Sequence, residues 1–188
     1  MSAATNPFAW FKPMSVPMPD MQGFWDRMAA MPKVMQIAQK VKCGATPHEV
    51  TYREDKLQVL HYTSDAPRKH KTPLVLAFAL VNRPYILDLL PGKSVVSHFV
   101  KAGFDVFMVD WGCPADGDRH LRGEDYINRY LHNVVQHVCE HTGQKQTSLM
   151  GYCMGGTLSA MYTALRPAMI RNLILMTAPI DFSAQGNL

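Results

Sequence analysis

A cysteine flanked by glycines is the residue of this chain that is best suited to act as a nucleophile. The segment Gly151–Gly156 reads GYCMGG, with Cys153 near its centre. A strand is predicted before it and a helix after it, which is the setting of a nucleophile elbow with cysteine in place of serine. The glycines leave room for a tight turn, and the start of the helix favours negative charge on the sulfur. The pattern predicts covalent catalysis through Cys153.

Acyl transfer to such a cysteine also needs two hydrogen-bond donors for the oxyanion that forms on the attacked carbonyl group. The backbone N–H of Met154 is the first expected donor, because the helix begins directly behind the sulfur. The second donor comes from the loop after an earlier central strand, here residues 80–84. We expect the Val81 N–H to be that donor, with Leu80 and Asn82 as the adjacent alternatives.

The elements around the cysteine are predicted to form a sheet covered by helices. Strands are predicted where short apolar runs occur, over residues 49–53, 57–62, 74–80, 105–109, 146–150 and 171–177. Helices are predicted over residues 94–102, 124–141 and 155–165. The first two strands, joined by a turn at residues 54–56, are expected to form an antiparallel hairpin. The later alternation of strand and helix indicates a mostly parallel sheet with helices on both faces.

The first 44 residues differ from the rest and are predicted to form a Met- and Pro-rich helical segment, with a catalytic domain over residues 45–188. From Asp20 onward, apolar residues recur at helical spacing, although Pro32 interrupts them: Phe24, Trp25, Met28, Met31, Met35 and Ile37. The first interpretation is a helix packed on the domain. The alternative is an adhesive surface for a partner or an apolar particle, since methionine-rich faces adapt to irregular surfaces.

Four motifs that occur in order resemble those of polyhydroxyalkanoate synthases. They are ALVNRPYILD at 79–88, DVFMVDWG at 105–112, GYCMGG at 151–156 and TAPIDF at 177–182. The resemblance covers about residues 45–188 and is greatest to the short catalytic subunits that work with a second protein. It implies an α/β-hydrolase fold, here apparently truncated after the sixth strand, because the chain stops soon after a buried strand.

The resemblance also implies a reaction. Cys153 would attack the thioester of a 3-hydroxyacyl coenzyme A, release coenzyme A and pass the acyl group to the hydroxyl of another unit, so that a polyester grows. No cofactor is expected. The implied partners are a second synthase subunit, further copies of the chain and the surface of a polyester granule in the cytoplasm.

The family's general base is a histidine with an aspartate beside it, and both lie downstream of the nucleophile. In this sequence no histidine follows Cys153, since the last one is His141. Those two catalytic positions therefore have no match, and we expect little or no turnover from the 188 residues alone. Asp181 follows the last predicted strand, where we expect it to act as a turn or capping residue.

Composition restricts the other classes of function. The chain is 47% hydrophobic and 18% charged, as in a globular enzyme. Its net charge is +4, but the basic residues are scattered along the sequence rather than clustered, so nucleic-acid binding is not expected. Cys43, Cys113 and Cys139 form no C-x-x-C pair with each other or with Cys153, so neither a disulfide framework nor a structural zinc is expected. His137 and His141 are expected on a solvated helix face rather than at a metal. The longest apolar run, at 74–81, is too short to span a bilayer.

Two other functions remain open at this point. A cysteine hydrolase of the dienelactone-hydrolase kind would pass the acyl group to water, so the ratio of free hydroxy acid to polymer distinguishes it from a synthase. A non-catalytic fragment would bind a partner subunit or granule through residues 1–41, and deletion of that segment would abolish its binding.

Overall fold

The computed structural model describes residues 21–40, 43–63 and 67–183, and the chain divides between Val41 and Lys42 into two compact units. The described part of the first unit is helix α1 (Met21–Lys40), which continues through Pro32, so the predicted interruption there is wrong. Trp25, Met28 and Met31 are exposed on α1. The side chains of Phe24, Met35 and Ile37 lie outside the described residues, as do residues 1–20.

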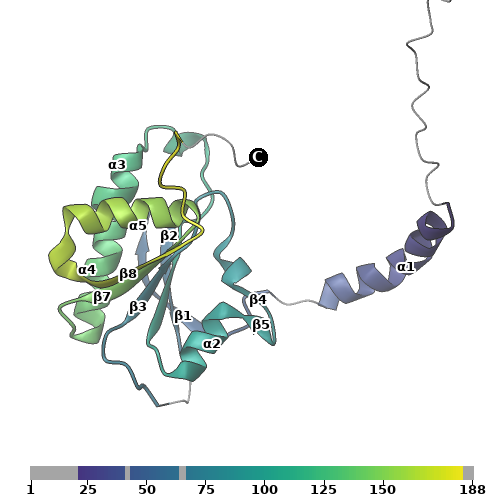
Figure 1. Ribbon diagram of the computed structural model, residues 1–188, viewed down its shortest axis with the longest axis horizontal. Helices are drawn as coiled ribbons and strands as arrows, with labels where there is room; N and C mark the ends of the chain where they lie inside the picture. Colours follow the sequence, from purple (N-terminus) through teal and green to yellow (C-terminus); the bar gives the residue numbers. More distant parts are fainter. Residues whose placement is uncertain (1–20, 41–42, 64–66, 184–188) are drawn as a thin grey trace, which may run out of the picture. The chain divides into compact units, whose positions relative to one another are not determined.

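The second unit is built on a six-stranded sheet in the order β1-β2-β6-β3-β7-β8 (Figure 1). Strands β6, β3, β7 and β8 run parallel, whereas β1 and β2 form an antiparallel hairpin that joins the sheet through β6. The strands are β1 (His48–Glu54), β2 (Leu57–Tyr62), β3 (Leu74–Ala77), β6 (Val106–Asp110), β7 (Thr147–Tyr152) and β8 (Ile170–Met176). The mostly parallel sheet predicted from the sequence is confirmed.

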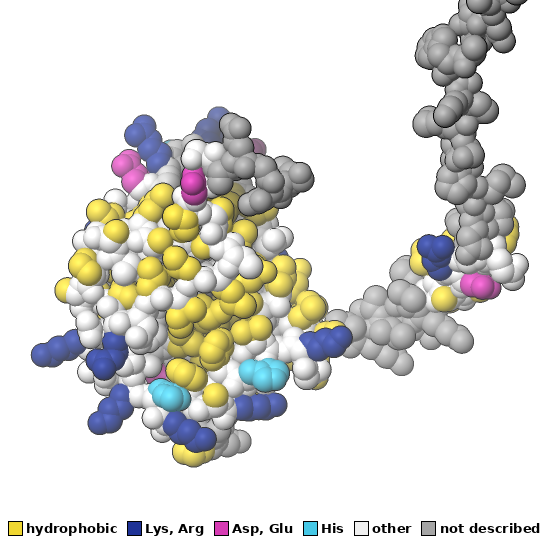
Figure 2. All heavy atoms as spheres, in the orientation of Figure 1, with side chains coloured by type: hydrophobic (Ala, Val, Ile, Leu, Met, Phe, Trp, Pro, Cys, Tyr) yellow, Lys and Arg dark blue, Asp and Glu magenta, His cyan; other side chains and the backbone are white. Residues whose placement is uncertain are grey.

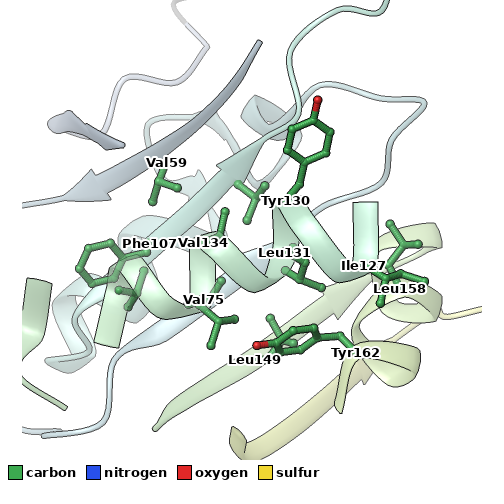
Figure 3. Packing of buried hydrophobic residues seen from close by; sticks show 14 of the residues in the cluster. Val59, Val75, Phe107, Ile127, Tyr130, Leu131, Val134, Leu149, Leu158 and Tyr162 are labelled. Carbon is green, nitrogen blue, oxygen red and sulfur yellow. The ribbon is translucent and has the colours of Figure 1, made fainter. Parts of the chain in front are cut away.

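Helices cover both faces of this sheet, and the alternation of side chains along β3 shows why. Leu74 and Leu76 pack with Val96 and Val100 of α2 (Val95–Ala102) on one face. Val75 and Ala77 contribute to the other face, beneath α4 (His132–Thr142) and α5 (Met154–Leu165). Figure 3 shows this second core, in which Leu131 and Val134 belong to one cluster with Val59, Val75 and Leu149. A strand with apolar side chains on both faces appears in the sequence as a continuous apolar run.

Helix ends follow the local chemistry of the sequence. The Ser94 hydroxyl accepts a hydrogen bond from the Ser97 N–H at 2.9 Å and caps the start of α2. Gly103 ends α2 in the left-handed conformation, with φ of 94°, which glycine adopts without a steric penalty. No helix in residues 21–40, 43–63 and 67–183 is long and apolar enough to cross a membrane.

Two predicted elements differ from the structure, and one small sheet was not predicted. The helix predicted over residues 124–141 is α3 (Gly123–Asp125), a π-helical segment (Tyr126–Leu131) and then α4. The strand predicted to reach Leu80 ends at Ala77, because only Leu74–Ala77 pair with β6 and β7. A small second sheet of β4 (Asp88–Leu90) and β5 (Lys93–Ser94) was not predicted. Short 3-10 turns complete the unit at Pro84–Leu87, Asp116–Asp118 and Pro167–Met169.

Candidate active site

Cys153 lies in the turn between β7 and α5, at the position predicted for the nucleophile. Its backbone has φ of 52° and ψ of −128°, a conformation that costs free energy for any residue other than glycine. Hydrogen bonds hold the turn on both sides, since the Cys153 N–H donates to Met176 O of β8 at 3.0 Å and the Gly156 N–H donates to Cys153 O at 2.8 Å. The side chain is half-buried, and it borders the core beneath α2.

The glycines around Cys153 allow the helix to approach the sheet closely. A Cβ on Gly155 would lie 2.8 Å from the Ala77 carbonyl carbon and closer still to the carbonyl oxygens of Ala77 and Phe78. A Cβ on Gly151 would lie 2.7 Å from Gly155 O, and one on Gly156 would overlap Ala178. Real Cβ atoms do not come so close to backbone, so a larger residue at these positions would displace α5 from β3 and β7.

The loop after β3 adjoins this turn, as the position of β3 in the sheet requires. Ala77, the last residue of β3, is paired with Gly151 of β7, so residues 78–83, which we call the β3 loop, start beside Cys153. The Phe78 ring stacks on Tyr152, the residue before Cys153, with centroids 5.1 Å apart and an angle of 10° between the rings. Val81 is 79% exposed in this loop, and Met154 is the first residue of α5. That their N–H groups bind the oxyanion remains a prediction.

A second loop contacts the β3 loop through Trp111 and Cys113. Residues 110–114, which we call the β6 turn, begin at the last residue of β6, and β6 lies on the opposite side of β3 from β7. The indole Nε1–H of Trp111 donates to Phe78 O at 2.8 Å, and Arg83 Nη2 donates to Cys113 Sγ at 2.6 Å. The DWG motif in the sequence marks this turn, but no sequence pattern indicates which backbone oxygen its indole reaches.

Asp181 occupies a turn after β8, in agreement with the role preferred from the sequence. Its Oδ1 accepts hydrogen bonds from Ser183 N at 2.9 Å and Ser183 Oγ at 2.7 Å. Asp88, whose side chain is buried, accepts from the N–H and the hydroxyl of Thr46 at 2.9 and 2.7 Å. These bonds give both carboxylates structural roles.

His137 and His141 behave differently from the expectation of a solvated helix face. His137 is half-buried, its Nε2 lies 3.1 Å from Thr51 Oγ1, and its ring lies 5.0 Å from that of Tyr52. Burial is the main cause that lowers the pKa of His137, and the neighbouring His141 lowers it further. The solvated-face prediction is therefore wrong for His137, because α4 packs that side of the helix on β1. Among the described residues, no group of three or more His, Cys, Asp or Glu side chains is placed to hold a metal ion.

The other cysteines differ in burial. Cys43 and Cys113 are exposed, whereas Cys139 is buried in the core beneath α4, where burial raises the pKa of its thiol. A buried thiol with a raised pKa is a poor nucleophile.

Comparison with known families agrees with this geometry. A family model described as the alpha/beta hydrolase fold matches residues 84–186, more than half of the chain. A second model, described as the N-terminus of poly-beta-hydroxybutyrate polymerase (PhaC), matches residues 22–99 and so spans the boundary between the two units.

Curated relatives of this sequence are named poly(3-hydroxyalkanoate) polymerase subunit PhaC. The protein from Haloferax mediterranei is 46% identical over 161 residues, which is 86% of this chain and 33% of the relative. The proteins from Synechocystis sp. and Allochromatium vinosum are 41% and 39% identical and are matched over 39% and 43% of their lengths, with 79% and 80% of this chain covered. The chain thus spans between a third and somewhat over two fifths of these relatives.

Solved structures support the fold alone. The Francisella virulence factor BioJ superposes with a TM-score of 0.56 at 14% identity, over 86% of this chain and 53% of that one. An alpha/beta hydrolase enzyme from a lagoon-sediment metagenome gives a TM-score of 0.50 at 19% identity, over 68% and 51% of the two chains. Together with the family models, these findings show that the chain belongs to the alpha/beta hydrolase fold family and is related in sequence to the poly(3-hydroxyalkanoate) polymerases.

Proposed function

We propose that this chain carries the nucleophile of an acyltransferase that polymerises 3-hydroxyacyl coenzyme A into polyhydroxyalkanoate with release of coenzyme A. The observation that carries the proposal is the strained backbone of Cys153 at the start of α5, in a chain whose curated relatives are named polymerases of this polyester. Strained backbone is retained where the surrounding structure requires it, and such positions concentrate at functional sites.

The first chemical step forms a thioester on the enzyme. The Cys153 thiolate adds to the carbonyl carbon of the substrate thioester, and the resulting oxyanion accepts hydrogen bonds from the Met154 and Val81 N–H groups. Met154 suits this role because the first N–H groups of a helix have no acceptor within the helix. The tetrahedral adduct then collapses, the bond to the coenzyme A sulfur breaks, and coenzyme A leaves as its thiolate. One thioester replaces another, so the acyl group stays activated.

The second step extends the polyester. The hydroxyl oxygen of another 3-hydroxyacyl unit attacks the carbonyl carbon on Cys153 Sγ, loses its proton to a base, and displaces the Cys153 thiolate as an ester forms. Within the 188 residues no histidine follows Cys153 to serve as that base. We therefore expect this chain to be acylated on Cys153 but to turn over little or not at all.

The proposed division of labour places the chemistry in residues 45–188 and contacts with a second subunit or a granule surface in residues 1–44. Exposed Trp25, Met28 and Met31 on α1 support an apolar contact surface in that segment. The proposed partners are a second synthase subunit, further copies of the chain and the surface of a polyester granule in the cytoplasm.

Acylation of the purified chain by 3-hydroxybutyryl coenzyme A tests the proposal. Intact and peptide mass spectrometry should find one 3-hydroxybutyryl group on Cys153, with one coenzyme A released for each group gained. Cys153→Ala should abolish both signals. Cys43→Ala is the matched control, because it removes an exposed thiol outside the β7–α5 turn and should leave both signals unchanged.

Two results would contradict the proposal. Acylation spread equally over the exposed Cys43 and Cys113 would show that Cys153 has no special reactivity. Free 3-hydroxybutyrate that accumulates in a Cys153-dependent manner would point instead to a cysteine hydrolase, because the acyl group would then pass to water.

A further inference from the structure

We propose that Trp111 is a positioning residue, which holds the β3 loop in the conformation that presents the Val81 N–H to the oxyanion. This inference rests on the proposed acyl transfer at Cys153. Its basis is the hydrogen bond from Trp111 Nε1 to Phe78 O at 2.8 Å, supported by the bond from Arg83 Nη2 to Cys113 Sγ at 2.6 Å. The two bonds join the β6 turn to the beginning and the end of the β3 loop.

Phe78 is where the two halves of the proposed oxyanion site meet. Its carbonyl oxygen accepts the Trp111 bond and also lies against Gly155, at the start of the helix that carries the Met154 N–H. Its ring, which is almost fully buried, stacks on Tyr152 next to the nucleophile. A bond that fixes the Phe78 peptide group therefore fixes the β3 loop relative to both Cys153 and Met154.

The β6 turn that supplies the indole is itself held to the rest of the fold. Gly112 has φ of 74°, and a Cβ there would lie only 2.5 Å from Lys56 O in the β1–β2 hairpin, so the turn lies directly on the hairpin. The Gly112 N–H donates to Asp110 Oδ1 at 3.0 Å. Lys56 also forms an ion pair with Asp118, whose carboxylate accepts from the Ala115 N–H at 2.7 Å. The backbone that carries the Trp111 indole is therefore held in place.

The Trp111 ring is also oriented by its neighbours. It is half-buried in a small pocket that it shares with Tyr126, Tyr130 and Leu121, and it meets the Tyr126 ring edge-on with centroids 5.7 Å apart. Packing of this kind restricts the rotamer of the indole, so its N–H points to one acceptor.

The position of the Val81 N–H affects the rate only of reactions in which an oxyanion develops. Acyl transfer from a thioester passes through a tetrahedral oxyanion, whereas alkylation of the same sulfur by iodoacetamide displaces iodide and forms no oxyanion. Removing an oxyanion donor outright slows a reaction by about 100-fold to 1,000-fold, so loosening the loop that carries one should slow acylation by about tenfold. Alkylation of Cys153 should be unaffected.

The experiment compares Trp111→Phe with the unsubstituted 188-residue chain, with each reaction followed at Cys153 by peptide mass spectrometry. Trp111→Phe keeps an aromatic ring and removes the N–H. The expected result is acylation by 3-hydroxybutyryl coenzyme A about tenfold slower, with iodoacetamide alkylation unchanged. Tyr126→Phe is the control, since it changes a polar group in the same pocket and should alter neither rate. Arg83→Met removes the second bond at an exposed position, and it should slow acylation by a smaller factor.

Hydrogen exchange of residues 78–83 provides a readout that does not depend on activity. In Trp111→Phe these amides should exchange faster than in the parent chain, while the exchange rates of the α4 amides stay the same. Unchanged exchange in this loop overturns the proposal, as does an equal fall in the acylation and alkylation rates, which indicates a general structural defect. Failure of the parent chain to be acylated on Cys153 would refute the proposed function instead, and the exchange result would still decide the role of Trp111.

Discussion

Replacement of Gly155 by alanine tests whether close approach of α5 to β3 builds the site. The added methyl carbon would lie 2.8 Å from the Ala77 carbonyl carbon and closer to the oxygens of Ala77 and Phe78. These are backbone atoms of a central strand and cannot rotate away, so α5 must move off the sheet by about an ångström. Overpacking of this kind costs about 1 to 3 kcal/mol, and we expect the upper end because the neighbours are backbone.

Two other glycines separate this steric effect from the general effects of an alanine substitution. A Cβ on Gly117 meets nothing within 4 Å and its φ is not left-handed, so Gly117→Ala should change the free energy of unfolding by less than about 0.5 kcal/mol. Gly143 also has open space, but its φ is 65°, so Gly143→Ala should cost about 1 to 2 kcal/mol through backbone strain alone. The expected order of destabilisation is therefore Gly155, then Gly143, then Gly117.

Urea unfolding followed by circular dichroism measures the three free energies of unfolding on one scale. Displacement of α5 should also slow Cys153 acylation in Gly155→Ala, because the Met154 N–H moves with the helix, while Gly117→Ala keeps the parent rate. A Gly155→Ala chain as stable as Gly117→Ala would refute the reasoning, since the contact would then be absent in solution. Loss of a cooperative transition in Gly155→Ala alone would agree with it.

Two further expectations concern pH and self-association. Burial, and after it His141, lowers the pKa of His137 below its ordinary 6.5, so the unfolded chain binds that proton more tightly and stability falls as the pH drops below about 6.5. His137→Gln should flatten the pH dependence of the unfolding free energy in that range relative to the exposed-site control His120→Gln, and equal slopes would contradict this cause. Strand β8 is at the edge of the sheet in the described residues and exposes apolar side chains there, in the part of the domain where Figure 2 shows hydrophobic side chains gathered. An exposed apolar edge favours association between copies of the chain. Leu175→Lys should therefore reduce the concentration-dependent self-association that sedimentation measures. Leu165→Lys, a more exposed position on α5, should reduce it less, and equal effects would exclude the edge as the cause.

Much of the fold follows from the sequence because the signals there are local and mutually consistent. The run at 74–77 is apolar at every position because both faces of β3 are covered, and Ser94 and Gly103 mark the ends of α2. The errors arise where local signals are equivocal. An apolar stripe predicts one helix over residues 124–141, but it does not reveal the π-helical segment at Tyr126–Leu131, since one inserted residue hardly changes the stripe. Pro32 disfavours a helix interior locally, and α1 nevertheless continues through it.

The candidate site also has features that could be predicted from the sequence and features that could not. The turn at Cys153 was predictable because its three glycines lie within three residues of the cysteine and complete a strand–turn–helix pattern. The contact of Trp111 with Phe78 was not, because 33 positions separate the two residues and no periodicity relates them. The burial of His137 was also missed, since it depends on the packing of α4 against Tyr52 and Thr51 of β1.

The order of the strands explains why the nucleophile depends on residues so distant in sequence. β3 comes before β6 and β7 along the chain but lies between them in the sheet, and all three are parallel, so the loops at their carboxyl ends meet at one edge. The β3 loop therefore has the Cys153 turn on one side and the β6 turn on the other. Glycines allow close approach on the first side, whereas Trp111 and Arg83 supply hydrogen bonds on the second. A loop held from one side only could move away from the sulfur, so the contacts of the β6 turn are as necessary to the proposed oxyanion site as the glycines that frame Cys153.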